Sequence, residues 1–252
     1  MSETKIVLID VGTHFAQEYR SLFGSTLWFW YRVMRRMAGY LLLGRGSGVK
    51  VSEIVGLAQS RKLIRRSRSR FRVVFVEANS RVVQKDIYRS ADDVLCIALT
   101  GASHTQFSLT KLFFANDDEE GQGNSIYENK GGRKSAAYNI CAAVPADVFA
   151  KSYKELLDSE YSSYEVVLRI NCEGSEDAVV YAFKKHFGCR FKLILGSLKD
   201  VREVKGDLAF EELERFIETN DMRMTNFSSL ASSWPKAHLL LAKLVDSTGS
   251  RA

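Results

Sequence analysis

The chain has 252 residues, of which 46% are hydrophobic and 26% are charged, with a net charge of +6 and two prolines. This length suits one large α/β domain, and the composition is that of an ordinary globular protein, which disfavours extensive disorder. The four cysteines form no Cys-x-x-Cys pair and no Cys/His cluster, so we expect buried free thiols and no metal site.

The first predicted strand is the apolar run at residues 6–9, which is followed by Asp10. Gly12 comes two residues later and can turn the backbone tightly beneath a ligand, and residues 16–22 are compatible with a helix. This order is typical of the first strand, turn and helix of a nucleotide-type α/β fold. The strand begins too early to leave room for a signal peptide, so we expect a cytoplasmic protein.

Residues 25–70 form a predicted helical insertion between the first helix and the second strand. In nucleotide-binding βαβ units an acid follows the glycine turn by about 20 residues, whereas Glu77 comes 65 residues after Gly12. A second helix is predicted over residues 52–66, with Ser52 as a candidate N-cap and Ile54, Val55 and Ala58 facing inward. In the first helix of the insertion, one face carries apolar residues and the opposite face carries arginines. The apolar face comprises Leu27, Trp30, Tyr31, Met34, Ala38 and Leu41, and the basic face comprises Arg32, Arg35 and Arg36.

Three interpretations of this insertion remain open. It can be a helical hairpin that packs on the domain with a solvated basic edge, or a platform over the active site that binds an acceptor. In the second case Trp28 suits stacking on a sugar face and Arg32 suits an anionic group. The third interpretation is contact with a membrane surface or a polyanion, because the segment is too short and too rich in arginine to cross a bilayer.

Further apolar runs alternate with helical segments along the rest of the chain. The runs lie at residues 73–76, 94–99, 109–114, 140–144, 166–170, 191–195 and 239–245. Residues 176–187 and 210–218 show helical spacing of apolar side chains, and Gly188 is positioned to end the first of these helices. The alternation predicts a Rossmann-like, doubly wound α/β fold with a mainly parallel sheet.

Four short motifs resemble those of the FkbM family of S-adenosylmethionine-dependent methyltransferases. They are Asp10-Val-Gly12-Thr13-His14, Val76-Glu77-Ala78-Asn79, Asn124-Ser125-Ile-Tyr127 and Ile170-Asn171-Cys-Glu173-Gly174. They occur in the family's order and span most of the chain. The resemblance implies a single domain over residues 1–252 and a seven-stranded sheet of the class I methyltransferase type. Residues 239–245 would then form its last, antiparallel strand.

The resemblance also implies a binding site for S-adenosylmethionine. Glu77, at the end of a strand, would accept hydrogen bonds from the ribose hydroxyls, and Gly12 would let the methionine part approach the backbone. Asp10 would orient the turn or bind the cofactor's ammonium group, and His14 would either bind its carboxylate or fill space. The complete set of predicted cofactor-binding residues is Asp10, Gly12, Thr13, His14, Glu77, Ala78, Ala98, Leu99 and Ser125.

Glu173 is the predicted catalytic residue, because it follows a central strand at the edge where open α/β sheets place their chemistry. It would act as a general base, or else it would only stabilise the dipole of the following helix. His104 is a second candidate base, and Tyr127 joins Trp28 and Arg32 as a predicted substrate-binding residue. The glycine-rich segment 121–132 reads as a loop that could close over the cofactor.

The expected function is therefore O-methylation of a small molecule or of a sugar hydroxyl in a glycan. A catalytically silent binding protein is the main alternative, because His14, Ala78 and Asn171 replace residues of the family motifs. Methylation of RNA is disfavoured, since Pro145 and Pro235 are isolated and form neither a Pro-Pro-aromatic nor a Pro-Cys motif. A dehydrogenase is disfavoured because the turn after Gly12 lacks the further glycines that a pyrophosphate needs.

Overall fold

The computed structural model describes residues 3–43, 51–101, 106–114, 123–128, 130, 137–227 and 234–249. Its central element is a six-stranded sheet in which every neighbouring pair is parallel. The strand order is β3-β2-β1-β7-β8-β9. The strands are β1 (Lys5–Val11), β2 (Phe71–Val76), β3 (Asp93–Leu95), β7 (Tyr164–Ile170), β8 (Phe191–Gly196) and β9 (Arg223–Thr225).

The centre of this sheet is buried on both faces, which explains the continuous apolar runs that predicted it. All seven residues of β7 are buried, and six of the seven in β1 are buried. Their register pairs Ile6 with Glu165 and Val11 with Ile170. Parallel strands that are covered on both faces are rich in Val, Ile and Leu, because neither side of the strand faces water.

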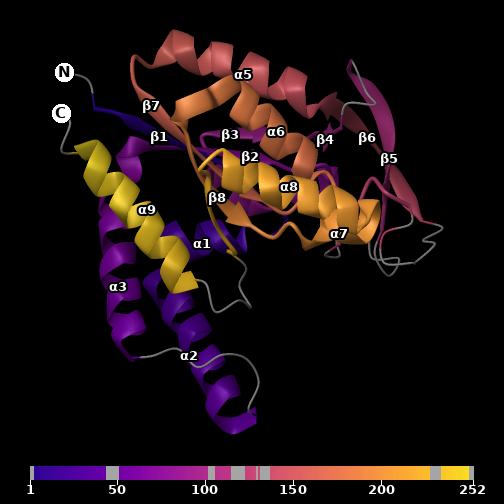
Figure 1. Ribbon diagram of the computed structural model, residues 1–252. Helices are drawn as coiled ribbons and strands as arrows, with labels where there is room; N and C mark the ends of the chain where they lie inside the picture. The colour runs from indigo at the N-terminus through magenta and orange to yellow at the C-terminus, as the bar shows by residue number, and fades with distance from the viewer. Residues whose placement is uncertain are drawn as a thin grey trace.

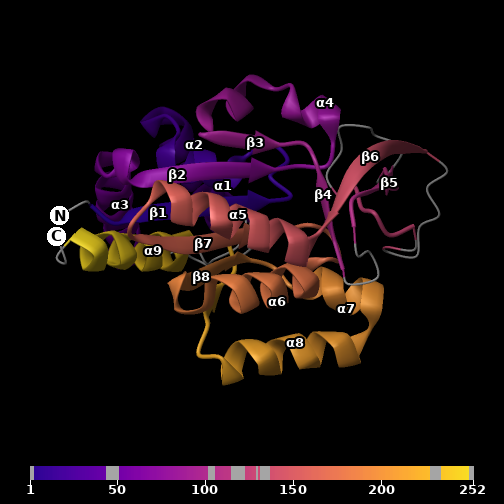
Figure 2. The ribbon, with the colours of Figure 1, turned by 90° about the horizontal axis from the view of Figure 1, so that it is seen from above.

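Helices cover both faces of the sheet, as Figures 1 and 2 show. On one face lie α5 (Ala146–Glu160), α6 (Glu176–Phe187), α7 (Lys199–Lys205) and α8 (Asp207–Thr219). On the other face lie α1 (Gln17–Phe23), α2 (Thr26–Leu43), α3 (Val51–Arg66) and α9 (Trp234–Gly249). A short helix, α4 (Ser80–Val83), follows β2. The result is a mixed α/β architecture that is compatible with a Rossmann-like fold.

A second, smaller sheet stands beside the end of the main sheet where β2 finishes (Figure 2). Its order is β4-β6-β5, with β4 (Ala98–Thr100), β5 (Ser108–Phe113) and β6 (Tyr138–Pro145). β4 is parallel to β6, whereas β5 is antiparallel to it. The predicted run at residues 94–99 is thus divided between two sheets, because β3 ends at Leu95 and β4 begins at Ala98.

The prediction of a final strand at residues 239–245 is wrong, since this segment lies inside α9. Ala237, Leu241 and Val245 are buried at helical spacing, while Leu239 is 45% exposed. A continuous apolar run fits a buried strand and a packed helix equally well by periodicity alone. The main sheet has six strands among the described residues, so a seven-stranded sheet is not confirmed.

The described part of the insertion contains the helices α2 and α3, but the inward faces of these two helices are different from those expected. Phe29 and Val33 are the buried side chains of α2, whereas Leu27, Tyr31 and Met34 are exposed. In α3 the inward side chains include Leu57, Arg61 and Ile64, and Val55 is 52% exposed. α3 begins at Val51, so Ser52 lies within the helix rather than before it. The apolar residues of α2 surround much of the helix, and packing against α9 decides which of them are buried.

The cysteines differ in exposure, and the helices were compared with the requirements for crossing a membrane. Cys141 is buried, but Cys96 and Cys189 are exposed, so the expectation of buried thiols holds for only part of the set. Of the helices in the described part of the chain, none has both the length and the apolar character needed to cross a membrane.

Candidate functional site

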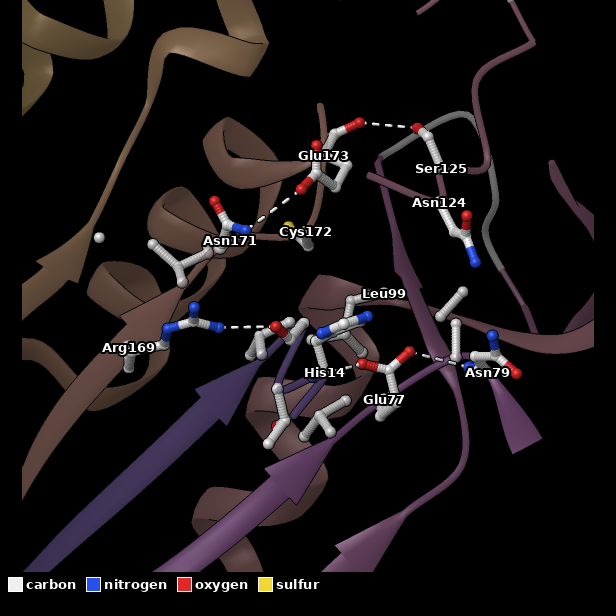
Figure 3. Close-up of a pocket in the computed structure, with 18 of the residues that line it drawn as sticks. His14, Glu77, Asn79, Leu99, Asn124, Ser125, Arg169, Asn171, Cys172 and Glu173 are labelled. Carbon is white, nitrogen blue, oxygen red and sulfur yellow. Dashed lines mark hydrogen bonds between the residues drawn. The ribbon is translucent and has the colours of Figure 1, made fainter. Parts of the chain in front are cut away.

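A cavity of about 220 Å³ lies at the carboxyl ends of β1, β2 and β7. The order β3-β2-β1-β7-β8 reverses its direction of winding between β1 and β7. Ligands of open α/β sheets bind at such a reversal, because the loops that leave the two strands diverge there. The second sheet and the loop before β6 close the far side of the cavity, and Figure 3 shows the residues around it.

The turn after β1 forms one wall of the cavity. Gly12 has a φ of 72°, and its N–H donates to the carbonyl oxygen of Val76 at 2.9 Å. A Cβ at this position would lie 2.0 Å from the carbonyl oxygen of Asn171, so the close approach of the two loops requires glycine. His14 also has a positive φ, of 48°, which is uncommon for a residue with a side chain.

Glu77 occupies the next wall, immediately after β2, and its side chain points into the site (Figure 3). One carboxylate oxygen accepts the backbone N–H of His14 at 2.8 Å, and the other accepts the N–H of Asn79 at 2.9 Å. Glu77 therefore connects the first and second turns of the fold. Each oxygen keeps lone-pair capacity for a further donor, because an ionised carboxylate has about four acceptor positions.

Asp10 does not line the cavity, and its carboxylate forms a buried ion pair with Arg169 of β7. Arg169 Nη1 lies 3.0 Å from Asp10 Oδ1 and also donates to the carbonyl oxygen of Gly12 at 2.6 Å. Its Nη2 lies 3.1 Å from a carboxylate oxygen of Glu18. Burial raises the pKa of Asp10 to about 7, although Arg169 acts in the opposite direction. These three side chains form a buried network beneath the glycine turn.

Glu173 lies on the opposite side of the cavity from Glu77 (Figure 3). Its φ is 61°, and its carboxylate accepts a hydrogen bond from the Asn171 side chain at 3.1 Å. The other oxygen forms an ion pair with Lys130, whose ammonium group also lies 3.2 Å from Asp200. The hydroxyl of Ser125 donates to the backbone carbonyl of Glu173 at 2.7 Å, which ties this loop to the second sheet.

Glu176 supports the loop that carries Glu173. Its two carboxylate oxygens accept the backbone N–H groups of Cys172 at 3.0 Å and Gly174 at 2.8 Å. Burial raises the pKa of Glu176 to about 7. The dipole-stabilising position at the start of α6 that the sequence suggested for Glu173 thus belongs to Glu176, which is the first residue of the helix.

The structure brings together most of the residues that the sequence predicted for the site. The predicted residues that line the cavity are Gly12, Thr13, His14, Glu77, Ala78, Ala98, Leu99, Ser125 and Glu173. Tyr127 is not among the lining residues, and its hydroxyl lies 3.4 Å from that of Ser175. His104 and residues 121–122, 129 and 131–132 of the predicted loop lie outside the described residues.

Trp28 and Arg32, the predicted acceptor-binding residues, do not line the cavity. Arg32 lies over the Trp28 ring at 5.6 Å, and its guanidinium group donates to the Gln17 side chain at 3.4 Å. Gln17 itself lines the cavity. These two residues of α2 therefore reach the site through Gln17 of α1, and the geometry does not favour an acceptor platform formed directly by Trp28 and Arg32.

Arg169 and Lys130 are the important residues that sequence reasoning missed. A charge inside the apolar run 166–170 was the available signal for Arg169, since a buried charge requires a partner. Lys130 gave no such signal, because it lies in a polar, glycine-rich segment. In the described part of the chain, no group of three or more His, Cys, Asp or Glu side chains is arranged to hold a metal ion.

The chain matches no protein-family model, no curated protein and no solved structure.

Proposed function

We propose that the protein binds S-adenosylmethionine and transfers its methyl group to a hydroxyl of a small molecule or of a sugar in a glycan. The observation that carries the proposal is the position of Glu77 beside the Gly12 turn, at the reversal point of the sheet. A carboxylate there can accept both hydroxyls of a ribose, as acids after the second strand do in nucleotide-binding α/β folds. In this proposal the fold is of the class I methyltransferase type.

The rest of the cavity suits the other parts of this cofactor. Ala98, Leu99 and Leu112 supply an apolar wall next to Glu77, which fits an adenine ring. The methionine part would extend across the glycine turn towards His14, whose strained backbone is held by Glu77 and by the Tyr88 hydroxyl at 2.8 Å. Backbone strain of this kind is maintained mainly at functional sites, which supports a ligand at this turn.

Glu173 would accept the proton from the acceptor. Bound S-adenosylmethionine would supply the methyl group: the acceptor oxygen would gain the methyl carbon as the sulfur–methyl bond breaks, and the Glu173 carboxylate would take the hydroxyl proton. The products are the methyl ether and S-adenosylhomocysteine. Lys130 forms an ion pair with Glu173, so an acceptor hydroxyl must either displace the lysine or approach the other carboxylate oxygen.

A catalytically silent binding protein is the second candidate, and the same ion pair favours it. Glu173 is already engaged by Lys130 and by the Asn171 side chain, both of which reduce its availability as a base. Under this alternative the cavity would hold the nucleoside ligand while Glu173 only closes the rim of the site.

An acceptor screen with labelled S-adenosylmethionine distinguishes the two candidates. We expect methyl transfer by the wild type, and a rate about 100-fold lower for Glu173→Gln with cofactor affinity unchanged, because the amide is a far weaker base. Glu155→Gln is the matched control, since Glu155 is exposed on α5 and away from the cavity. Cofactor binding without transfer to any acceptor would favour the silent protein, and no cofactor binding at all would contradict both.

A further inference from the structure

A second hollow lies between the two helices of the insertion, outside the site described above. This open groove of about 450 Å³ is lined by Thr26, Phe29, Trp30, Ala58, Arg61, Lys62, Arg65 and Arg66. The Arg65 guanidinium donates to the Thr26 hydroxyl at 2.6 Å and so connects α3 to the start of α2. Figure 1 shows these two helices projecting from the body of the molecule, away from α5 and α8.

Within the described part of the chain, acidic side chains do not balance the positive charge of this groove. Among the described residues, no carboxylate lies within ion-pair distance of the four groove cations. Residues 25–70 contain eleven Lys and Arg but a single acidic residue, Glu53, whereas the net charge of the whole chain is +6. The remainder of the chain is therefore net acidic, and the insertion carries the basic character of the protein.

Arg61 is the most buried of these cations, with 5% of its surface exposed. Its guanidinium donates to the backbone carbonyl oxygens of Ser21 and Gly24 at 2.8 and 2.6 Å, and it lies over the Phe29 ring. Burial, together with the charge of Arg65, lowers the pKa of Arg61 to about 10. An anion in the groove would relieve this repulsion.

Exposed apolar side chains border the groove. Leu27 is 85% exposed, and Tyr31 and Met34 are each 61% exposed, so positions i, i+4 and i+7 form one outward stripe along α2. Val55 of α3 is 52% exposed and lies about two helical turns before Lys62. Basic residues beside an outward apolar stripe are typical of helices that lie in the interface of a membrane.

We propose that the α2–α3 hairpin docks on an anionic phospholipid surface. Headgroup phosphates bind in the groove at Lys62, Arg65 and Arg66, while Leu27, Tyr31 and Met34 enter the boundary between headgroups and acyl chains. Charge complementarity selects an anionic surface, and the aliphatic side chains distinguish a lipid surface from a nucleic acid. A nucleic acid would be bound by phosphate contacts and by stacking on aromatic rings, and would leave Leu27 and Met34 in water. This inference is independent of the chemistry at the Glu77 cavity.

Co-sedimentation of the full chain with vesicles tests the proposal. Wild type should bind vesicles that contain 30% phosphatidylserine in phosphatidylcholine, bind pure phosphatidylcholine far more weakly, and lose affinity in 0.5 M NaCl. The double variant Lys62→Gln/Arg66→Gln should lower the partition coefficient by about 25-fold, which is about fivefold for each cation removed. Its matched control is Lys151→Gln/Arg215→Gln, a pair of exposed cations on α5 and α8.

The apolar stripe has its own variant and control. Leu27→Gln/Met34→Gln should lower the partition coefficient at least tenfold, whereas Leu208→Gln/Val148→Gln on α8 and α5 should not. All of the substituted residues are exposed, so each variant should remain folded, and circular dichroism checks this. The proposal is overturned if wild type does not bind the anionic vesicles, if it binds both vesicle types equally, or if the controls lose as much affinity. Tighter binding to a single-stranded RNA than to anionic vesicles would also overturn it.

Discussion

Arg169 and Asp10 form a buried ion pair across the central strands, with 3.0 Å between Arg169 Nη1 and Asp10 Oδ1. Their side chains are 7% and 3% exposed, and Arg169 reaches Glu18 as well, so one cation satisfies two buried carboxylates. The same guanidinium group donates to the carbonyl oxygen of Gly12. This arrangement supports the turn on which the proposed cofactor site depends.

We expect Arg169→Met to lower the free energy of unfolding by about 3–5 kcal/mol, because it leaves two buried carboxylates without their cation. Urea unfolding at pH 7.5 measures the effect. The control is Arg190→Met, which removes one of the two cations paired with Asp158; the side chains of Arg190 and Asp158 are 37% and 36% exposed. An exposed pair of this kind contributes about 0–1 kcal/mol. Equal losses in the two variants would contradict a supporting role for Arg169.

A pair of glycine substitutions tests the close approach of the loops at the site. In Gly12→Ala the new Cβ meets the Asn171 carbonyl oxygen at 2.0 Å, so we expect a loss of at least about 2 kcal/mol and no cofactor binding. Gly56→Ala lies in α3 with no atom within 4 Å of the new Cβ. It should stabilise the protein by about 0.5–1 kcal/mol, because alanine favours a helix. A Gly12→Ala variant as stable as wild type would show that the loops can separate freely.

The pH dependence of stability tests the buried state of Glu176. Its folded-state pKa is raised to about 7, above the unfolded value near 4.5, so the folded protein holds the proton more tightly. This contribution to stability is complete below pH 4.5 and is lost as the pH rises to about 7. Glu176 should thus contribute on the order of 3 kcal/mol to the decline that urea unfolding of wild type shows over that range, in addition to the contribution of Asp10, whose pKa is also raised to about 7. Glu176→Gln should reduce the decline by the share of Glu176, and an unchanged slope in that variant would contradict the assignment.

The sequence predicted the parts of the fold whose local pattern and tertiary environment agree. β1 and β7 are buried on both faces, so their apolar runs identify them without knowledge of their neighbours. α6 was predicted with its observed bounds, because its apolar residues are spaced helically and Gly188 follows the last of them.

The errors fall where apolar residues surround a helix and only packing selects the buried side. Phe29 of α2 stacks with Trp234 of α9, with ring centroids 6.2 Å apart, and so turns Leu27 and Tyr31 towards solvent. The residues that make this contact are separated by most of the chain, so no local pattern in α2 records it. Residues 239–245 of α9 were predicted as a strand for the same reason, because the local sequence pattern does not record the packing of α9 against distant segments.

The residues of the candidate site also separate into those that the sequence predicted and those that it did not. Residues in the turns directly after strands were predicted, because the carboxyl ends of parallel strands meet at one edge of the sheet. The cations that pair with the acidic residues of the site were not predicted. Arg169 is 159 residues from Asp10, and Lys130 is distant in sequence from its partner Glu173. Geometry was needed to show that Asp10 is paired with Arg169 and that Glu77 presents a carboxylate to the cavity beside the glycine turn.

Calorimetric titration of wild type and Glu77→Gln with S-adenosylmethionine and with S-adenosylhomocysteine is the most direct test of the proposed cofactor site. Gln is preferred to Ala, because one oxygen remains to accept a backbone N–H from His14 or Asn79 and the turn is less disturbed. Loss of charge-assisted hydrogen bonds to the ribose, worth about 1.5–3 kcal/mol, should weaken binding at least tenfold, while Glu155→Gln binds as wild type does. Failure of wild type to bind either compound, or equal affinity in Glu77→Gln, would contradict the assignment of this cavity as a methyltransferase cofactor site.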